Sequence, residues 1–336
     1  MPAAQTGVPF EVLMAEPSSR TPSSSESFHT KFRLLRDTIG NIIVGQEQVV
    51  EDLLIAALAR GHVLLEGVPG LGKTRLVRAF ADATELTFSR IQFTPDLMPA
   101  DVTGTNVFVE AGDERRFEFQ PGPVFTHVLL ADEINRATPK TQSALLEAMQ
   151  ERAVTVAGKQ YVLEEPFMVL ATQNPLEMEG TYPLPEAQLD RFLFKVLIRR
   201  PDAATLQRIL LATTGEREAT VTPVFSRAEL LELQRMLRAV PVAESALAYV
   251  VRLVEATHEH PLVRLGASPR GAQAVTLAAK GYALAAGRPN VELEDVRRAV
   301  PAALRHRLLL SFEAEVEGAD PDAVLEEVVA QADRGR

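Results

Sequence analysis

The sequence predicts a doubly wound α/β domain with a parallel sheet, followed by a smaller all-helical domain. From Phe28 to about Arg200, short apolar runs alternate with helical patterns, which is typical of a parallel sheet with helices on both faces. A glycine-rich loop joins the first of these runs to a helical pattern. After Arg200 the strand signals stop, and helical patterns continue towards the C-terminus. The sheet is therefore expected in the first part of the chain and helices alone in the second.

Five apolar runs are the expected strands, and several are apolar on both faces, as strands buried in a parallel sheet are. They are His62–Glu66, Leu86–Phe93, His127–Ala131, Phe167–Thr172 and Phe194–Ile198. The helical patterns between them cover Glu47–Ala59, Lys73–Ala83 and Pro139–Arg152. The last of these follows Thr138, a good N-cap residue, and starts with a proline.

Two further stretches interrupt this alternation and are predicted to be β-hairpins. Val107–Val109 and Phe117–Phe119 flank a turn at residues 111–114. Val154–Val156 and Gln160–Val162 flank a second turn at residues 157–159. Neither hairpin is needed to build the sheet, so both are expected to be insertions.

The second part of the chain contains helical patterns with recognisable ends. They cover Ala203–Thr213, Arg227–Ala239, Glu244–His258, Pro269–Ala286, Leu293–Val300 and Pro321–Gln331. Ser226 and Glu229 form a capping box, Ser268 and Asp320 each precede a proline at the first helical position, and Gly287 suits a helix C-terminus. We therefore expect an α/β domain over residues 28–200 and a helical domain over residues 201–336. Residues 1–27 are predicted to be a disordered tail, because the serine-rich stretch at residues 17–25 is low in apolar content and cannot bury a face.

Composition narrows the classes of function. The 336 residues are 46% hydrophobic and 24% charged, which is ordinary for a globular protein, and they contain no cysteine, which excludes disulfides and thiolate chemistry. The N-terminus has no basic segment followed by an apolar one, and no apolar run is long enough to cross a bilayer, so we expect a cytoplasmic protein. The formal net charge of −10 argues against a protein that grips nucleic acid through its phosphates, although a local basic loop is compatible with it.

One loop matches the phosphate-binding pattern GxxxxGK[ST]. Its residues are Gly67, Val68, Pro69, Gly70, Leu71, Gly72, Lys73 and Thr74. It follows an apolar strand and opens a helix, which is the context that separates such a loop from an ordinary glycine-rich turn. Backbone N–H groups would surround phosphate oxygens, Lys73 would reach the β- and γ-phosphates, and the Thr74 hydroxyl would ligate Mg²⁺. The sequence therefore predicts binding of ATP with Mg²⁺.

An acidic pair ends the strand at residues 127–131. Ligands bind at the carboxyl ends of parallel strands, so Asp132 is expected to hold Mg²⁺ through its water shell. Glu133 is expected to act as the general base that polarises the attacking water. The alternative, that Asp132 only caps a turn, loses weight beside a phosphate-binding loop.

Three polar residues further along the chain are candidates for the same site. Asn174 follows the strand at residues 167–172 and either orients the attacking water or serves as a turn residue before Pro175. Arg191 precedes the last strand, and Arg270 lies at the second position of a helix, where the dipole disfavours a cation. Each arginine is either a cation for the charge that develops in phosphoryl transfer or a partner in a surface ion pair.

Taken together, these motifs resemble the AAA+ ATPases, and within them the MoxR family, from about Leu34 to the C-terminus. The most specific stretches are Ile43–Gln46, Gly67–Thr74, Gln92–Asp101, Ala131–Ala137, Ala171–Pro175 and Tyr182–Phe192. The resemblance implies that Asn174 is sensor 1, Arg191 an arginine finger, Arg270 sensor 2 on a helical lid, and Val44 and Gly45 the segment that packs on adenine. Arg75, directly after the loop, completes the implied nucleotide-binding set.

The resemblance also implies a homo-oligomer, expected to be a hexameric ring, with residues 102–119 as the helix-2 insert and residues 153–163 as the pre-sensor-1 insert facing its pore. It implies a chaperone-like factor that matures protein complexes or inserts metal cofactors, together with a partner that carries a von Willebrand factor A domain. Two alternatives are the ATPase subunit of a chelatase-like complex and a nucleic-acid motor. The hairpin charges disfavour the motor, because Arg115 and Arg116 stand among Glu110, Asp113, Glu114 and Glu118.

Overall fold

The computed structural model describes residues 24–111, 114–176, 180–214 and 220–334. Its centre is a five-stranded sheet in the order β2-β5-β8-β1-β9, and every neighbouring pair is parallel. The strands are β1 (Val63–Glu66), β2 (Phe88–Gln92), β5 (Val128–Asp132), β8 (Met168–Gln173) and β9 (Phe194–Leu197). The five predicted strands are therefore confirmed, each within a few residues of its expected ends.

Side chains alternate across the sheet, and each face has its own hydrophobic cluster. Val63 and Leu65 of β1 belong to one cluster, and Leu64 between them belongs to the other. Helices α2 (Glu47–Leu58) and α3 (Lys73–Ala83) cover the first face, and α5 (Pro139–Glu151) covers the second. Because both faces are covered, the domain is doubly wound, as the run of two-sided apolar strands predicts.

Helix α1 (Ser24–Gly40) has no counterpart among the predicted elements. It begins inside the range predicted to be a disordered tail, so that prediction is wrong for residues 24–27, while residues 1–23 lie outside the described residues. The helix buries one side chain per turn along a single face: Phe28, Phe32, Leu35 and Ile39, each at most 1% exposed. This spacing is a helical signal that the serine-rich composition just before it obscured.

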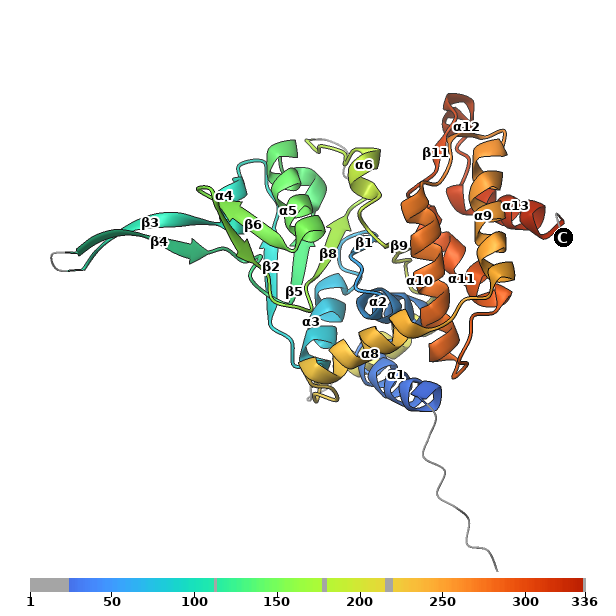
Figure 1. Cartoon of the computed structure of the whole chain (residues 1–336), viewed down its shortest axis with the longest axis horizontal. Helices are drawn as coiled ribbons and strands as arrows, with labels where there is room; N and C mark the ends of the chain where they lie inside the picture. Colours follow the sequence, from blue (N-terminus) through green and yellow to red (C-terminus); the bar gives the residue numbers. More distant parts are fainter. Residues whose placement is uncertain (1–23, 112–113, 177–179, 215–219, 335–336) are drawn as a thin grey trace, which may run out of the picture.

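The two predicted hairpins are present as separate two-stranded sheets. Strands β3 (Gly104–Ala111) and β4 (Glu114–Pro121) form the longer one, which projects away from the rest of the molecule at the left of Figure 1. Strands β6 (Ala153–Val156) and β7 (Lys159–Val162) form the shorter one. Phe119 stacks on Tyr161 with ring centroids 3.9 Å apart, so the two hairpins touch. Between β2 and β3, the chain forms the short helix α4 (Pro99–Thr103).

The second part of the chain is helical, as predicted, with one addition. Its helices are α7 (Ala203–Thr213), α8 (Arg227–Ala239), α9 (Glu244–Glu259), α10 (Pro269–Ala285), α11 (Leu293–Leu304), α12 (Phe312–Val316) and α13 (Pro321–Arg334). The addition is a two-stranded antiparallel sheet of β10 (Val263–Leu265) and β11 (Leu309–Leu310), which are too short to give a sequence pattern. The predicted caps at Ser226 and Ser268 are present, since each side chain accepts a backbone N–H three residues on.

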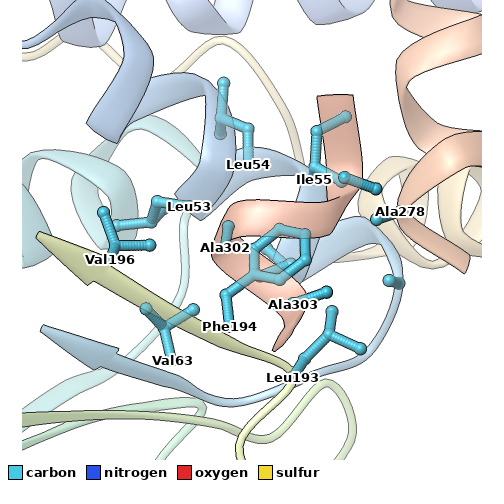
Figure 2. Close-up of a cluster of buried hydrophobic side chains, with 14 of the residues drawn as sticks. Leu53, Leu54, Ile55, Val63, Leu193, Phe194, Val196, Ala278, Ala302 and Ala303 are labelled. Atoms are coloured by element: carbon cyan, nitrogen blue, oxygen red, sulfur yellow. The ribbon is translucent and has the colours of Figure 1, made fainter. Parts of the chain in front are cut away.

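The helical part and the sheet share one hydrophobic cluster. Figure 2 shows Phe194 of β9 lying among side chains of α2 and α11, with Ala278 of α10 nearby. Helix α8 also packs on α2. The two expected domains are thus continuous in packing, which holds the helical part firmly against one face of the sheet. In the described parts of the chain, no helix is both long enough and apolar enough to span a bilayer.

Candidate functional site

The carboxyl ends of three neighbouring strands bring most of the candidate residues to one edge of the sheet. The phosphate-binding loop follows β1, Asn174 follows β8, and the acidic pair ends β5. Strand β8 lies between the other two in the sheet order. The Gly67 N–H donates to the Gln173 carbonyl at 3.3 Å, which fixes the start of the loop beside β8. Residues separated by about a hundred positions in the sequence are therefore neighbours at this edge.

The loop has the conformation that its glycines allow. Gly70 and Gly72 have φ of +83° and +79°, in the left-handed region that side chains disfavour. A Cβ at Gly67 would lie 2.7 Å from the carbonyl oxygen of Ile198, so only glycine fits there. The Lys73 ammonium donates to the Gly67 carbonyl at 2.7 Å and so closes the loop from its far end. The loop then runs straight into α3, with Thr74 and Arg75 in its first turn.

The acidic pair is held by side chains from the adjacent strands. One oxygen of Asp132 accepts a hydrogen bond from the Thr172 hydroxyl at 2.6 Å, and the other accepts from Arg90 at 2.7 Å. Glu133 accepts from the Gln92 amide at 2.8 Å and from Arg136 at 3.0 Å. Both carboxylates are thus oriented by donors that the sequence did not single out for this purpose.

Thr172 ties the pair together, because its hydroxyl also accepts the Glu133 N–H at 2.8 Å. Glu133 itself has φ of +54°, and a left-handed conformation in a non-glycine residue costs of order 1–3 kcal/mol. Such strain is found mainly where the surrounding contacts fix a functional side chain. The backbone at Glu133 is therefore held against its own preference, with its carboxylate at the same edge as the loop.

Asn174 is 6% exposed, and its side-chain oxygen accepts the Leu176 N–H at 3.1 Å. This is the turn interaction that the sequence offered as one of two alternatives. It leaves the amide nitrogen of Asn174 unconstrained by that hydrogen bond, so the turn role and a role towards a nucleotide are compatible.

A pocket of about 550 Å³ lies beside the loop, between α2, the end of β9 and the start of α7. Gly45 lines it, and Gly45 has φ of +77°, a further position that favours glycine. Gln46, also in the wall, donates from its amide to the Leu71 carbonyl of the loop at 3.2 Å. The residue that follows the segment expected to pack on adenine thus contacts the phosphate-binding loop directly.

The residues present suit ATP and Mg²⁺. Where a Cβ would stand on Gly70 and on Gly72, no atom lies within 4 Å, so the surface of the loop is open to a phosphate group. Thr74 and Asp132 supply a hydroxyl and a carboxylate oxygen, the hard donors that Mg²⁺ prefers. When bound, the ion neutralises charge on the phosphates.

Arg191 and Arg270 lie elsewhere. They line a pocket of about 240 Å³ together with Gly61, His62 and Leu193, which stand at the beginnings of β1 and β9. Arg191 donates to the Leu146 carbonyl of α5 at 2.7 Å. Ser268, the N-cap of α10, donates to Asp190 at 2.9 Å and so places Arg270 beside Arg191. In the described part of the chain neither arginine forms an ion pair, so the surface ion-pair alternative does not apply within one subunit.

Several residues of the site were not identified from the sequence. Arg90, Gln92 and Thr172 each hold a member of the acidic pair, and all three lie on strands next to β5 or at their ends. Their signal is weak, because a polar residue on a predicted strand has no partner until the strand order is known. Arg136, three residues after Glu133 in the sequence, pairs with the Glu133 carboxylate of its own chain.

The comparisons with known proteins agree with this geometry. A family model described as "ATPase family associated with various cellular activities (AAA)" matches residues 62–194, and one described as "AAA lid domain" matches residues 255–328. The crystal structure of a Cytophaga hutchinsonii protein superimposes with a TM-score of 0.84 at 39% identity, covering 91% of this chain and 95% of that one.

Among curated relatives, Chaperone MoxR1 of Mycobacterium tuberculosis is 44% identical over 90% of this chain and 81% of its own length. Protein YeaC of Bacillus subtilis is 45% identical over 91% of this chain and 95% of its own length. Protein MoxR of Paracoccus denitrificans is 33% identical over 86% of this chain and 91% of its own length. With the loop, the acidic pair and the helical lid in the expected order, and with relatives that match along nearly the whole chain, this protein belongs to the MoxR family of AAA+ ATPases.

Proposed function

We propose that this ATPase works as a ring of identical subunits, a hexamer, and uses ATP hydrolysis to remodel protein complexes during their maturation. The relative named as a chaperone supports the chaperone-like class of activity. The observation that carries the ring is the position of Arg191 and Arg270 at the opposite edge of the sheet from the phosphate-binding loop.

Within one subunit, the loop and the acidic pair supply most of the chemistry. Backbone N–H groups of the loop and Lys73 bind the phosphates, while Thr74 and Asp132 hold Mg²⁺. Glu133 takes a proton from the attacking water as that water adds to the γ-phosphorus and ADP leaves. Asn174, on the strand between them, orients that water. Gly45 lines the 550 Å³ pocket, and Gly45 and its neighbour Val44 contact the adenine.

The two arginines complete the site of a neighbouring subunit. Strand β1 spans four residues, so its two ends are about 13 Å apart, and the loop and the arginine pocket lie beyond opposite ends. A head-to-tail contact between copies brings the arginine edge of one subunit to the loop edge of the next, and repetition of this contact closes a ring. In this arrangement both Arg191 and Arg270 act in trans.

The hairpins favour protein as the client. Phe108 and Phe117 face each other across β3 and β4, with ring centroids 5.4 Å apart, and they are 54% and 73% exposed. Arg115 pairs with Glu110 at 2.8 Å, so its charge is balanced within the hairpin. Exposed aromatic side chains beside balanced charge suit an apolar polypeptide better than a phosphate backbone. We further propose that the protein works with a partner that carries a von Willebrand factor A domain. A cytoplasmic location stays a prediction.

Mixing two inactive variants tests the trans arrangement. Arg191→Ala and Glu133→Gln are each expected to be nearly inactive, since a finger contributes on the order of 10³ or more in rate. An Arg191→Ala subunit still carries Glu133, and its Glu133→Gln neighbour still carries Arg191, so their shared interface is complete. After equal mixing with subunit exchange, about a quarter of the interfaces are intact, and turnover should recover accordingly.

The control is Arg235→Ala, which removes an exposed arginine on the outer side of α8 and should leave turnover unchanged. Exchange is followed separately by energy transfer between labelled subunits. If subunits exchange and the mixture stays inactive, Arg191 does not complete a neighbour's site.

A further inference from the structure

The pocket that Arg191 and Arg270 line carries more positive charge than these two residues supply. Six arginines line it: Arg60, Arg152, Arg191, Arg238, Arg270 and Arg307. They come from separate parts of the fold, since Arg60 follows α2, Arg152 ends α5, Arg238 lies in the last turn of α8, and Arg307 follows α11. Only Asp190 among the lining residues is acidic. The tertiary fold thus assembles a positive potential that no stretch of sequence carries.

Three of these arginines form ion pairs with carboxylates of the same chain. Arg307 is 3% exposed and pairs with Asp190 at 2.7 Å. Arg60 and Arg152 both pair with Glu165, the latter at 2.6 Å, so two cations share a single carboxylate. These residues build the wall of the pocket, and their charges are only partly balanced.

Arg238 differs from them because, within the described residues, no carboxylate pairs with it. Burial, Arg60 and Arg152 together lower the pKa of its guanidinium, because the charged form is partly desolvated beside other cations. Lys280 of α10 adds another cation, donating to the Arg238 carbonyl at 3.0 Å. Arg238 is exposed in the isolated subunit, so solvent screens part of the repulsion from the other cations, and an anion in the pocket would add a favourable partner.

A purely structural role at the end of α8 does not explain why Arg238 lies in a pocket lined by other cations. A basic residue in the last turn of a helix interacts favourably with the dipole, but at an exposed position the gain is small. The same gain is available to any lysine or arginine that points away from the pocket. Arg238 instead lines the pocket, as Leu277 and Arg270 of α10 also do.

The size of the pocket limits the anion that enters it. Its volume of about 240 Å³ is below the roughly 300 Å³ at which sites for whole drug-sized ligands begin. A triphosphate group fits such a volume, whereas a complete nucleotide does not. The 550 Å³ pocket beside Gly45 has room for the nucleoside part. In the proposed ring, the two pockets would face one nucleotide from opposite sides of a subunit contact.

We propose that Arg238 is a third arginine, beside Arg191 and Arg270, that contacts the triphosphate of ATP bound by the neighbouring copy of this chain. This inference rests on the proposed head-to-tail ring. It assigns Arg60 and Arg152 the task of holding the positive wall behind Arg238, through their shared contact with Glu165. It makes the site sensitive to a residue of α8, a helix outside the motifs that the sequence analysis identified.

The test uses the full chain and three single variants. Arg238→Gln removes the charge, and Arg238→Lys keeps it. Arg235→Gln removes the charge of a likewise exposed arginine one turn earlier on the same helix that does not line the pocket. Loss of one charge-assisted hydrogen bond to a phosphate should lower ATP turnover of Arg238→Gln by at least about tenfold. Arg235→Gln should stay close to wild type, and Arg238→Lys should retain part of the activity.

The decisive measurement is turnover after mixing Arg238→Gln with Glu133→Gln under exchange. A complete interface needs Glu133 from the first variant and Arg238 from the second, so turnover should rise to about a quarter of wild type. This is well above the average of the two variants measured separately. Melting temperatures of all variants, measured by circular dichroism, report separately on folding.

Unchanged turnover in Arg238→Gln overturns the inference. So does a loss of turnover that mixing fails to restore while the Arg191→Ala mixture recovers, because Arg238 then acts within its own subunit and the ring proposal stands. If neither mixture recovers although subunits exchange, the trans arrangement itself is wrong, and the inference fails with it.

Discussion

Acidification should destabilise this protein through His62, a residue at the start of β1. The side chain is buried, its Nδ1 accepts the Val169 N–H at 2.9 Å, and its Nε2–H donates to the Met149 carbonyl at 3.1 Å. This pairing requires the neutral imidazole. The pKa of His62 is lowered from 6.5 to about 4; burial is the main cause, the Met149 hydrogen bond opposes it, and the nearby charge of Arg152 adds a smaller lowering.

The sign of the effect follows from proton binding. Between pH 6.5 and about 4 the unfolded chain binds a proton at His62 and the folded chain does not, so stability falls as the pH falls. The contribution of His62 is fully present above the unfolded pKa and is lost as the pH decreases towards the folded pKa. With these two values, the free energy of unfolding should decrease by about 2 kcal/mol between about pH 7.5 and about pH 5.

The assay is urea denaturation at both pH values, followed by far-ultraviolet circular dichroism, because the chain has no tryptophan to report by fluorescence. The comparison is with His62→Gln, whose amide oxygen and nitrogen can accept from Val169 and donate to Met149 but do not titrate. Burial also lowers the pKa of His306 and His127, so the wild type has other sources of acid sensitivity. The difference between the two proteins isolates His62. Equal decreases in wild type and variant would show that His62 does not titrate as its surroundings require.

Two further predictions concern the loop and the core. Lys73→Ala should lose tight ATP binding, since the ammonium that closes the loop is also the group proposed to contact the phosphates. Binding is measured with a fluorescent ATP analogue, and Lys159→Ala is the control. If Lys73→Ala binds the analogue as tightly as the control does, Lys73 is not part of the site. Phe194→Ala should lower the free energy of unfolding by about 3–5 kcal/mol, because the ring lies fully buried in the cluster of Figure 2. Phe117→Ala, 73% exposed, should leave the melting temperature unchanged, and a similar loss in both variants would contradict this account.

The sheet could be predicted because its signals are local. Each strand is a short apolar run, and the glycine-rich loop marks where the first strand meets its helix. Helix α1 carries a helical signal, since Phe28, Phe32, Leu35 and Ile39 repeat at helical spacing, but the serine-rich residues at its start favour a disordered segment. Strands β10 and β11 could not be predicted, since two or three residues carry no pattern of their own.

The candidate site divides in the same way. The loop and the acidic pair are contiguous in sequence, so motif and strand context were enough to place them. The residues that orient the pair, such as Thr172 and Gln92, depend on strand order, which is a property of the whole sheet. The arginine pocket is harder still to predict from the sequence, since Arg60, Arg152 and Arg238 line one pocket only after α2, α5 and α8 have packed together.

The long hairpin has a mechanical consequence. Gly104 and Gly122 meet at its root, where a Cβ on Gly122 would lie 2.5 Å from the Gly104 nitrogen, so backbone packs directly on backbone there. Strand β3 has 8 residues, which gives the arm a length of about 26 Å. A rigid arm of that length converts a rotation of about 10° at its root into a displacement of about 4–5 Å at its outer end. The hairpin would therefore act as a lever on α4: Phe108 and its partner Phe117 lie about 13 Å from the root, so the same rotation would move them by about 2 Å.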